Sequence, residues 1–158
     1  MKTLISHPSP PTPGKAANVF LRRLRRVLTP LVDLLLRAWV GYAFWISGWL
    51  KLNSWDSTLY LFQFEYAVPL LPSPAAAVLA TAVELLGPLG LFLGLFGRSA
   101  AALLFGFNIV AVLSYPELGA AGLEQHRTWG LLLLVLMAHG PGRWSLDAWL
   151  AQLRRRPD

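Results

Sequence analysis

The sequence predicts an all-α integral membrane protein in which four helices cross the bilayer as a bundle. Hydrophobic residues make up 55% of the 158 residues and charged residues only 14%, and the mean hydropathy is +0.49. Such values are typical of lipid-facing chains. Apolar runs long enough to cross a hydrocarbon core of about 30 Å recur along the chain. The seven tryptophans fit an interfacial aromatic belt.

The N-terminal part precedes the first apolar run. Residues 1–18 are rich in proline and lack apolar periodicity, so we expect a disordered cytoplasmic tail. They lack the apolar stretch and cleavage site of a signal peptide, and we expect uncleaved insertion. Residues 19–28 place four arginines between leucines, which predicts a basic juxtamembrane helix at an anionic leaflet. A plain positive-inside stop signal explains the same arginines.

Residues 29–150 form the predicted four-helix transmembrane domain, and residues 151–158 a basic cytoplasmic tail. The third expected span, residues 100–114, is short, and the fourth, residues 120–138, begins with charged residues. Asp33 and Arg37, four residues apart near the start of the first span, can pair on one helix face or reach the interface. The expected spans are residues 31–50, 75–96, 100–114 and 120–138.

The charge distribution predicts the orientation in the membrane. With both termini inside, twelve of the fourteen Lys and Arg residues lie on the cytoplasmic side, and only Lys51 and Arg127 lie outside. This asymmetry favours an N-in, C-in topology in the inner membrane of a bacterium. Residues 53–74 then form a large external loop that either folds over the bundle as a lid or rests on the membrane surface.

Glu84 is the most informative residue, because a carboxylate near the middle of an apolar span is costly and suggests a function. We expect an at least partly protonated Glu84 that bonds to a polar group of another helix. The candidates are Asn108, His126 and Lys51, and Asn108 is the nearest by depth on the third span. Lys51 ends one face of the first span and is expected about 13 Å away unless its amine reaches down that face. A snorkelling anchor explains Lys51 equally well.

Other polar residues are expected at the same outer end of the bundle. His126 and Arg127 open the fourth span, and Glu65 and Tyr66 belong to the external loop. A solvated helix end is an equally good interpretation of His126. Glycines recurring every three or four residues from Gly87 onward predict close helix packing. The candidate ligand-binding residues are therefore Lys51, Glu65, Tyr66, Glu84, Asn108, His126 and Arg127.

Several function classes are excluded by composition. The chain has no cysteine, so it has no disulfide, thiolate metal site or iron–sulfur cluster of its own. His126 and His139 lie about 20 Å apart along one helix, so they cannot share a metal, and we expect no metal site. The basic residues flank apolar spans, which argues against nucleic acid. Any redox chemistry must therefore use a cofactor or a partner.

Three motifs follow one another along the chain: Gly48-Trp49-Leu50-Lys51-Leu52, Leu93-Gly94-Leu95-Phe96-Gly97-Arg98 and Gly140-Pro141-Gly142-Arg143-Trp144-Ser145-Leu146-Asp147. With these motifs the chain resembles the DoxX family of small four-helix membrane proteins, over about Leu35 to Leu150. The order and spacing of the motifs together make the resemblance specific, and residues 64–72 and 114–116 match one type within the family.

The resemblance implies a membrane subunit that works with other proteins. Some members are associated with oxidoreductases, including a thiosulfate:quinone oxidoreductase. The most similar type resembles members encoded beside iron-dependent peptide-modifying enzymes whose cysteine-rich products bind copper. We therefore expect an accessory subunit of a redox or peptide-modification system that binds quinone in an externally facing polar pocket. The alternative is a non-enzymatic transport or docking component with Glu84 as a proton or cation site.

Overall fold

A computed structural model describes residues 13–154, which fold into six α-helices without a strand. The all-α prediction is confirmed for this part of the chain. The predicted tail residues 1–12 and 155–158 lie outside the described residues. The helices are α1 (Pro13–Asn53), α2 (Trp55–Phe64), α3 (Ser73–Leu93), α4 (Gly97–Ser114), α5 (Gly119–His139) and α6 (Leu146–Leu153).

Three of these helices are long and apolar enough to cross a membrane: residues Ala17–Asn53, Ser73–Leu93 and Gly97–Ser114. The chain is thus a multi-pass membrane protein. Large exposed apolar side chains, among them Trp39, Tyr42 and Leu113, cover the outside of the helices, as expected of a lipid-facing surface. The predicted fourth span corresponds to α5, which is of similar length to α3 but begins with the charged residues already noted.

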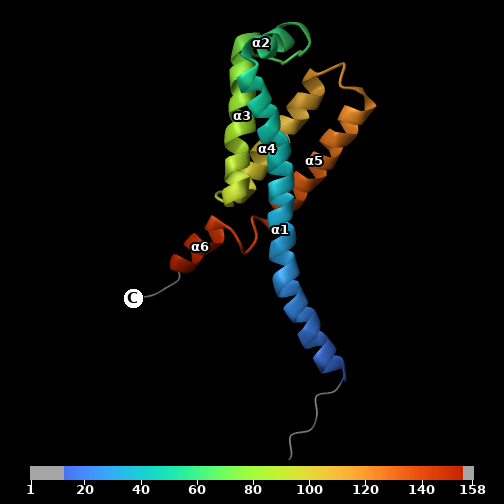
Figure 1. Cartoon of the computed structure of the whole chain (residues 1–158), viewed down its shortest axis with the longest axis vertical. Helices are drawn as coiled ribbons and strands as arrows, with labels where there is room; N and C mark the ends of the chain where they lie inside the picture. Colours follow the sequence, from blue (N-terminus) through green and yellow to red (C-terminus); the bar gives the residue numbers. More distant parts are fainter. Residues whose placement is uncertain (1–12, 155–158) are drawn as a thin grey trace, which may run out of the picture.

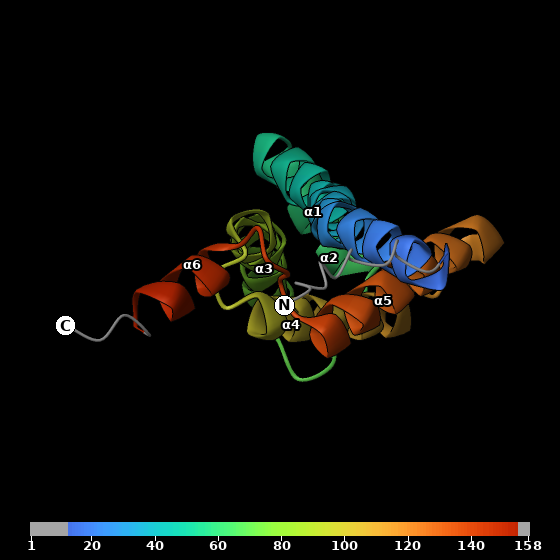
Figure 2. The same cartoon turned by 90° about the horizontal axis from the view of Figure 1, so that it is seen from below.

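The four long helices contact one another in ring order. α1 packs against α3 and α5, and α4 packs against α3 and α5. Figure 1 shows α1 and α3 side by side, with α4 and α5 inclined to one side and α2 over the end of α3. In the end-on view, α6 projects sideways next to α3 (Figure 2). The buried core between the helices includes Val40, Phe44, Leu91, Leu104 and Leu133.

α1 is longer than predicted. The sequence suggested a tail to residue 18, a separate basic helix over 19–28 and a span over 31–50, but one helix runs from Pro13 to Asn53 through Pro30. Pro13 lies in the first turn of this helix, where the missing N–H of proline is not needed. Apolar residues spaced at three and four positions continue the helix without a break. Only the upper part of α1 packs on the other helices (Figure 1).

The turn between α3 and α4 is fixed from the C-terminal segment. α3 stops at Leu93, earlier than the predicted residue 96, because Gly94 adopts a left-handed conformation with φ 62°. The Asp147 carboxylate accepts hydrogen bonds of 2.9 Å from the backbone amides of Phe96 and Gly97. Asp147 thereby caps the start of α4. Residues 146–153, partly assigned to a tail in the prediction, form α6 instead.

Asp33 and Arg37 are both buried beneath the segment that precedes α6. The Arg37 Nη2 atom donates a 2.5 Å hydrogen bond to the Trp144 carbonyl oxygen. The ion pairs among the described residues are Lys51–Glu84 and Arg127–Glu124, so Asp33 and Arg37 do not form the ion pair that their spacing allows. Folding of residues 140–147 under the helices encloses both side chains instead.

The glycines of α3 permit close packing against α4, as predicted. A methyl group at Gly87 would lie 2.8 Å from the Leu104 side chain, and one at Gly90 would lie 2.8 Å from Ala100. Real Cβ atoms essentially never approach other atoms so closely. The α3–α4 contact therefore depends on the small residues at these positions.

The predicted external loop contains the short helix α2. Thr58 and Phe62 of α2 are buried, and the Thr58 hydroxyl donates a 3.0 Å hydrogen bond to the Lys51 carbonyl at the end of α1. Beyond α2, the Ala67 amide donates a 2.7 Å hydrogen bond to the Ser114 carbonyl at the end of α4. Of the two predicted arrangements, the structure has this segment folded over the helix ends.

Candidate functional site

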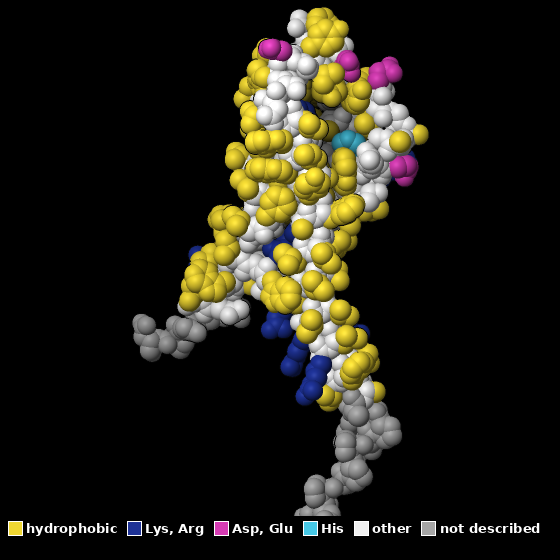
Figure 3. All heavy atoms as spheres, viewed as in Figure 1, with side chains coloured by type: hydrophobic (Ala, Val, Ile, Leu, Met, Phe, Trp, Pro, Cys, Tyr) yellow, Lys and Arg dark blue, Asp and Glu magenta, His cyan; other side chains and the backbone are white. Residues whose placement is uncertain are grey.

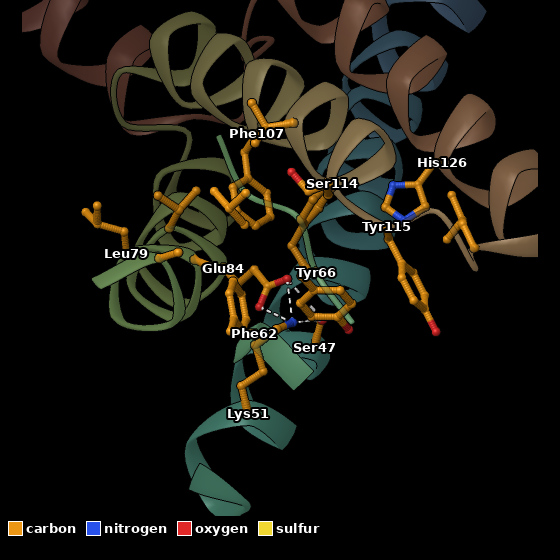
Figure 4. Close-up of a pocket in the computed structure, with 18 of the residues that line it drawn as sticks. Ser47, Lys51, Phe62, Tyr66, Leu79, Glu84, Phe107, Ser114, Tyr115 and His126 are labelled. Atoms are coloured by element: carbon orange, nitrogen blue, oxygen red, sulfur yellow. Dashed lines mark hydrogen bonds and ion pairs between the residues drawn. The ribbon is translucent and has the colours of Figure 1, made fainter. Parts of the chain in front are cut away.

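A cavity of about 340 Å³ lies between the helices at the α2 end of the molecule. It falls within the size range of small-molecule sites, about 300–1,000 Å³. Figure 4 shows polar side chains from α1, α3, α4 and α5 around it. Most of its walls are apolar or aromatic, including Phe44, Leu79, Val83, Phe107 and Trp129. The polar lining residues are Ser47, Lys51, Tyr66, Glu84, Ser114, Tyr115 and His126.

A buried ion pair joins α1 to α3 in this cavity. Lys51 Nζ lies 2.7 Å from Glu84 Oε2 and 2.9 Å from Oε1. Ser47, one turn before Lys51, accepts a 2.9 Å hydrogen bond from the amine and donates one of 3.1 Å to Glu84 Oε1. The exposed fractions of the Lys51 and Glu84 side chains are 17% and 7%. These donors suit an ionised carboxylate paired with an ammonium group.

Of the candidate partners of Glu84, the preferred one, Asn108, was therefore wrong, and Lys51 is the partner. Asn108 makes no hydrogen bond to Glu84, and the Lys51 amine lies within hydrogen-bonding distance instead of about 13 Å away. The Lys51 amine reaches down its helix face to Ser47, which brings it to the depth of Glu84. Gly48 lets the helices approach, because a Cβ atom there would lie 2.9 Å from the Glu84 Cβ. An estimate of depth from the rise per residue of straight helices includes neither the reach of the Lys51 side chain nor the close helix approach at Gly48.

Asn108 instead holds the imidazole of His126. Its Nδ2 group donates a 3.0 Å hydrogen bond to the His126 carbonyl, which orients its Oδ1 atom toward His126 Nδ1 at 2.7 Å. Because an amide oxygen only accepts hydrogen bonds, Nδ1 must carry a proton. In the neutral ring, Nε2 is then an acceptor, and no described residue bonds to it. The Trp129 indole packs against the ring at a centroid distance of 5.0 Å.

Three aromatic rings border the cavity on the side of the folded loop. Tyr66 lies 4.9 Å from both Phe62 and Tyr115, measured between ring centroids. Burial raises the pKa of Tyr66, and the neighbouring Tyr115 and Glu65 raise it further. The phenol therefore keeps its proton at neutral pH and can donate a hydrogen bond.

Ser114 provides a buried hydroxyl without a partner among the described residues. Only 4% of its surface is exposed, and its Oγ atom makes no hydrogen bond. Ser114 lines the cavity, so a bound ligand can supply the missing hydrogen bond. Sequence reasoning missed Ser47 and Ser114. The spacing of Ser47 four residues before Lys51 could have indicated the former, whereas Ser114 needed the fold of the loop.

Two predicted site residues lie elsewhere. Arg127 is exposed and pairs with Glu124 one turn earlier on α5, outside the cavity. Glu65 is also outside the lining set, although Tyr115 donates a long hydrogen bond of 3.5 Å to its carboxylate. The described residues contain no group of three or more metal-ligating His, Asp or Glu side chains.

The site can thus hold a flat, largely apolar ligand that carries oxygen atoms. The aromatic walls suit a ring, while the Tyr66 phenol can donate a hydrogen bond. His126 Nε2 can accept a proton from a hydroxyl group or, once protonated, return it. The Ser114 hydroxyl can donate or accept. The geometry is one of binding and proton exchange.

Comparison with known proteins places the chain in a family. No curated protein and no solved structure matches it. Residues 32–116 match the DoxX family, and this stretch covers more than half of the chain. It contains the Lys51–Glu84 ion pair, Asn108 and Ser114, but it ends before His126. The chain therefore belongs to the DoxX family.

Proposed function

We propose that this DoxX protein binds the head group of a quinone in the cavity at the α2 end and serves a partner oxidoreductase or peptide-modifying system in the bacterial inner membrane. Its role is that of an accessory subunit. Since the chain has no cysteine, a partner supplies the electrons.

One observation carries the proposal: an apolar cavity with a few polar groups placed at separate points of its wall. The ion pair of Lys51 and Glu84 lies at the α1–α3 interface, whereas His126 comes from α5. A quinone has two carbonyl oxygens on opposite sides of a flat ring. The Tyr66 or Ser114 hydroxyl can donate to a carbonyl oxygen of the quinone, and His126 Nε2 can accept from a hydroxyl group of the reduced form. The aromatic walls can pack on the ring.

The proposal includes a topology with both termini in the cytoplasm. α1, α3, α4 and α5 then form a transmembrane four-helix bundle, and the cavity faces the outer side. Acidic side chains gather at the α2 end of the molecule and basic side chains toward the other end (Figure 3). This distribution is the one that the positive-inside rule favours.

The alternative is transport or docking, with Glu84 as a proton or cation site. It has less support because the Lys51 ammonium already contacts both oxygens of the Glu84 carboxylate. A second cation would have to displace it, and the described residues offer no further carboxylate in the cavity.

The test is retention of quinone by the full-length protein purified from its native membrane. Quinone should co-purify with the wild type and with Glu124→Gln, whose carboxylate is on the surface of α5. It should be lost from a double variant, Lys51→Met with Glu84→Leu, which replaces the ion pair by apolar groups. Equal quinone in all three proteins would contradict the proposal. Proton or cation flux through liposomes of the wild type alone would favour the alternative.

A further inference from the structure

α1 carries a stripe of exposed apolar side chains that is longer than the hydrocarbon core of a membrane is thick. The helix has 41 residues, so it extends about 60 Å at about 1.5 Å per residue. A bilayer has a hydrocarbon core of about 30 Å. The stripe, which covers about 44 Å, is formed by Phe20, Leu24, Val27, Leu28, Leu31, Leu35, Tyr42, Ile46 and Trp49, all of them exposed.

The lower part of this stripe, from Phe20 to Leu28, is exposed and belongs to the part of α1 that extends beyond the other helices (Figure 1). Arg22, Arg23, Arg25 and Arg26 lie beside or opposite it, and residues 17–32 contain no acidic residue. Figure 3 shows the Lys and Arg side chains on one side of this part of the helix and hydrophobic side chains on the other. An apolar face bordered only by cations is typical of a helix on an anionic lipid surface.

Pro30 sits where the helix leaves the packed region. It is buried and on the same face as the buried residues Asp33, Arg37 and Val40, which pack against the other helices and the segment before α6. Because proline lacks an amide proton and its ring crowds the Arg26 carbonyl, it opens the helix on its own side. α1 runs through Pro30 as one helix. A bend there would turn the lower segment away from the other helices and set the apolar stripe on the concave side, toward the bilayer.

We propose that residues 17–29 of α1 lie on the surface of the anionic membrane leaflet, with Pro30 as the bend. The apolar stripe then enters the interface, and the arginines meet lipid phosphate groups. A second copy of the chain is disfavoured as the occupant because two such segments would bring eight arginines together without a counter-charge. The segment precedes the DoxX match at residue 32, so this surface is an addition to the family domain.

The absence of native cysteine allows a direct test in the full-length protein. Leu24→Cys on the stripe and Asn18→Cys on the arginine side each receive one fluorescent label. The proteins are reconstituted into vesicles whose lipids carry bromine on the upper acyl chain, either phosphatidylcholine alone or a mixture with phosphatidylglycerol. The bromine atoms quench a fluorophore only when it enters the interface.

We expect strong quenching at Leu24→Cys in the phosphatidylglycerol vesicles, weaker quenching in phosphatidylcholine and little quenching at Asn18→Cys. Changing the four arginines to glutamine should remove the difference between the two lipids. Equal quenching at both positions, or none at Leu24→Cys, would overturn the proposal. Disulfide formation between unlabelled Leu24→Cys copies at low protein density would also overturn the proposal, because it would identify a second chain as the occupant.

Discussion

The Lys51–Glu84 pair is the residue-scale feature on which the site depends. Burying an ion is costly unless a partner neutralises it, and each of these residues supplies the other's counter-charge at 2.7 Å. Pro88, four residues after Glu84, lacks the amide that would bond to the Glu84 carbonyl. α3 is therefore locally weakened at the point where it carries its charge, and the contact with α1 compensates.

Removing one member of the pair should be worse than removing both. Glu84→Gln leaves Lys51 without a counter-charge and should lower the free energy of unfolding by about 3–5 kcal/mol. The double variant Lys51→Met with Glu84→Leu should lower it by much less, because apolar groups replace both charges. Thermal unfolding in one detergent compares the two. A double variant as unstable as Glu84→Gln would show that the ion pair itself holds the helices.

Gly48 should tolerate no side chain. Gly48→Ala places a methyl group 2.9 Å from the Glu84 Cβ and 3.1 Å from its backbone carbon, so α1 and α3 must separate. We expect a loss of about 1–3 kcal/mol in the free energy of unfolding. Gly106→Ala is the control, since a Cβ atom there meets nothing within 4 Å. An unchanged free energy of unfolding in Gly48→Ala would mean that α1 and α3 can move apart without cost.

Asn108 should act by positioning His126. Asn108→Leu removes both hydrogen bonds and should allow the imidazole proton to move between Nδ1 and Nε2. Asn108→Asp keeps an acceptor for Nδ1 and should preserve the tautomer. Nitrogen NMR of isotope-labelled histidine distinguishes the two ring nitrogens. An unchanged His126 signal in Asn108→Leu would show that another group sets the tautomer.

At the scale of helices, two motifs that are far apart in the sequence form one structure. Leu93–Arg98 makes the turn between α3 and α4, and Gly140–Asp147 supplies the carboxylate that caps it. The Asp147 amide also donates to the Gly94 carbonyl at 3.1 Å. Through this connection the two motifs together stabilise the turn between α3 and α4.

The α3–α4 contact gives a prediction at this scale. Gly90→Leu should overpack the interface at Ala100 and lower the yield of folded protein, at a cost of about 1–3 kcal/mol. Gly106→Leu, on the open side of α4, should fold normally. Size-exclusion profiles and melting temperatures in detergent measure both. Equal behaviour of the two variants would place the Gly90 face against lipid.

At the scale of the whole molecule, the proposed orientation places the α2 end of the helices, which holds the cavity, on the outer side of the membrane. Ser57 on α2 and Ser99 at the start of α4 are both exposed and lie at opposite ends of the helices. In intact cells, an impermeant thiol reagent should label Ser57→Cys but not Ser99→Cys. The reverse pattern would place the cavity on the cytoplasmic side.

The apolar spans within α1, α3, α4 and α5 could be predicted from the sequence because apolar composition and periodicity determine them locally, whereas the short helices α2 and α6 were not predicted. Polar contacts were harder to predict. Tyr66 and His126 were expected at the same end as Glu84 from topology alone, and they do line one cavity. The Lys51–Glu84 and Asn108–His126 pairs depend on helix separation and side-chain reach, which no pattern along the chain encodes. The same is true of Arg37, whose partner comes from the distant residue Trp144.

The proposal that the cavity holds a quinone is tested most directly by photoaffinity labelling of the full-length protein in lipid nanodiscs. The probe is a short-chain quinone that carries an azide on its ring, and excess unmodified quinone serves as competitor. Ala111→Trp fills the cavity from α4, whereas Ala102→Trp changes the exposed side of the same helix. We predict competed labelling of cavity residues in the wild type and Ala102→Trp, and its loss in Ala111→Trp. Labelling that is confined to lipid-facing residues, or that survives Ala111→Trp, would contradict the proposal.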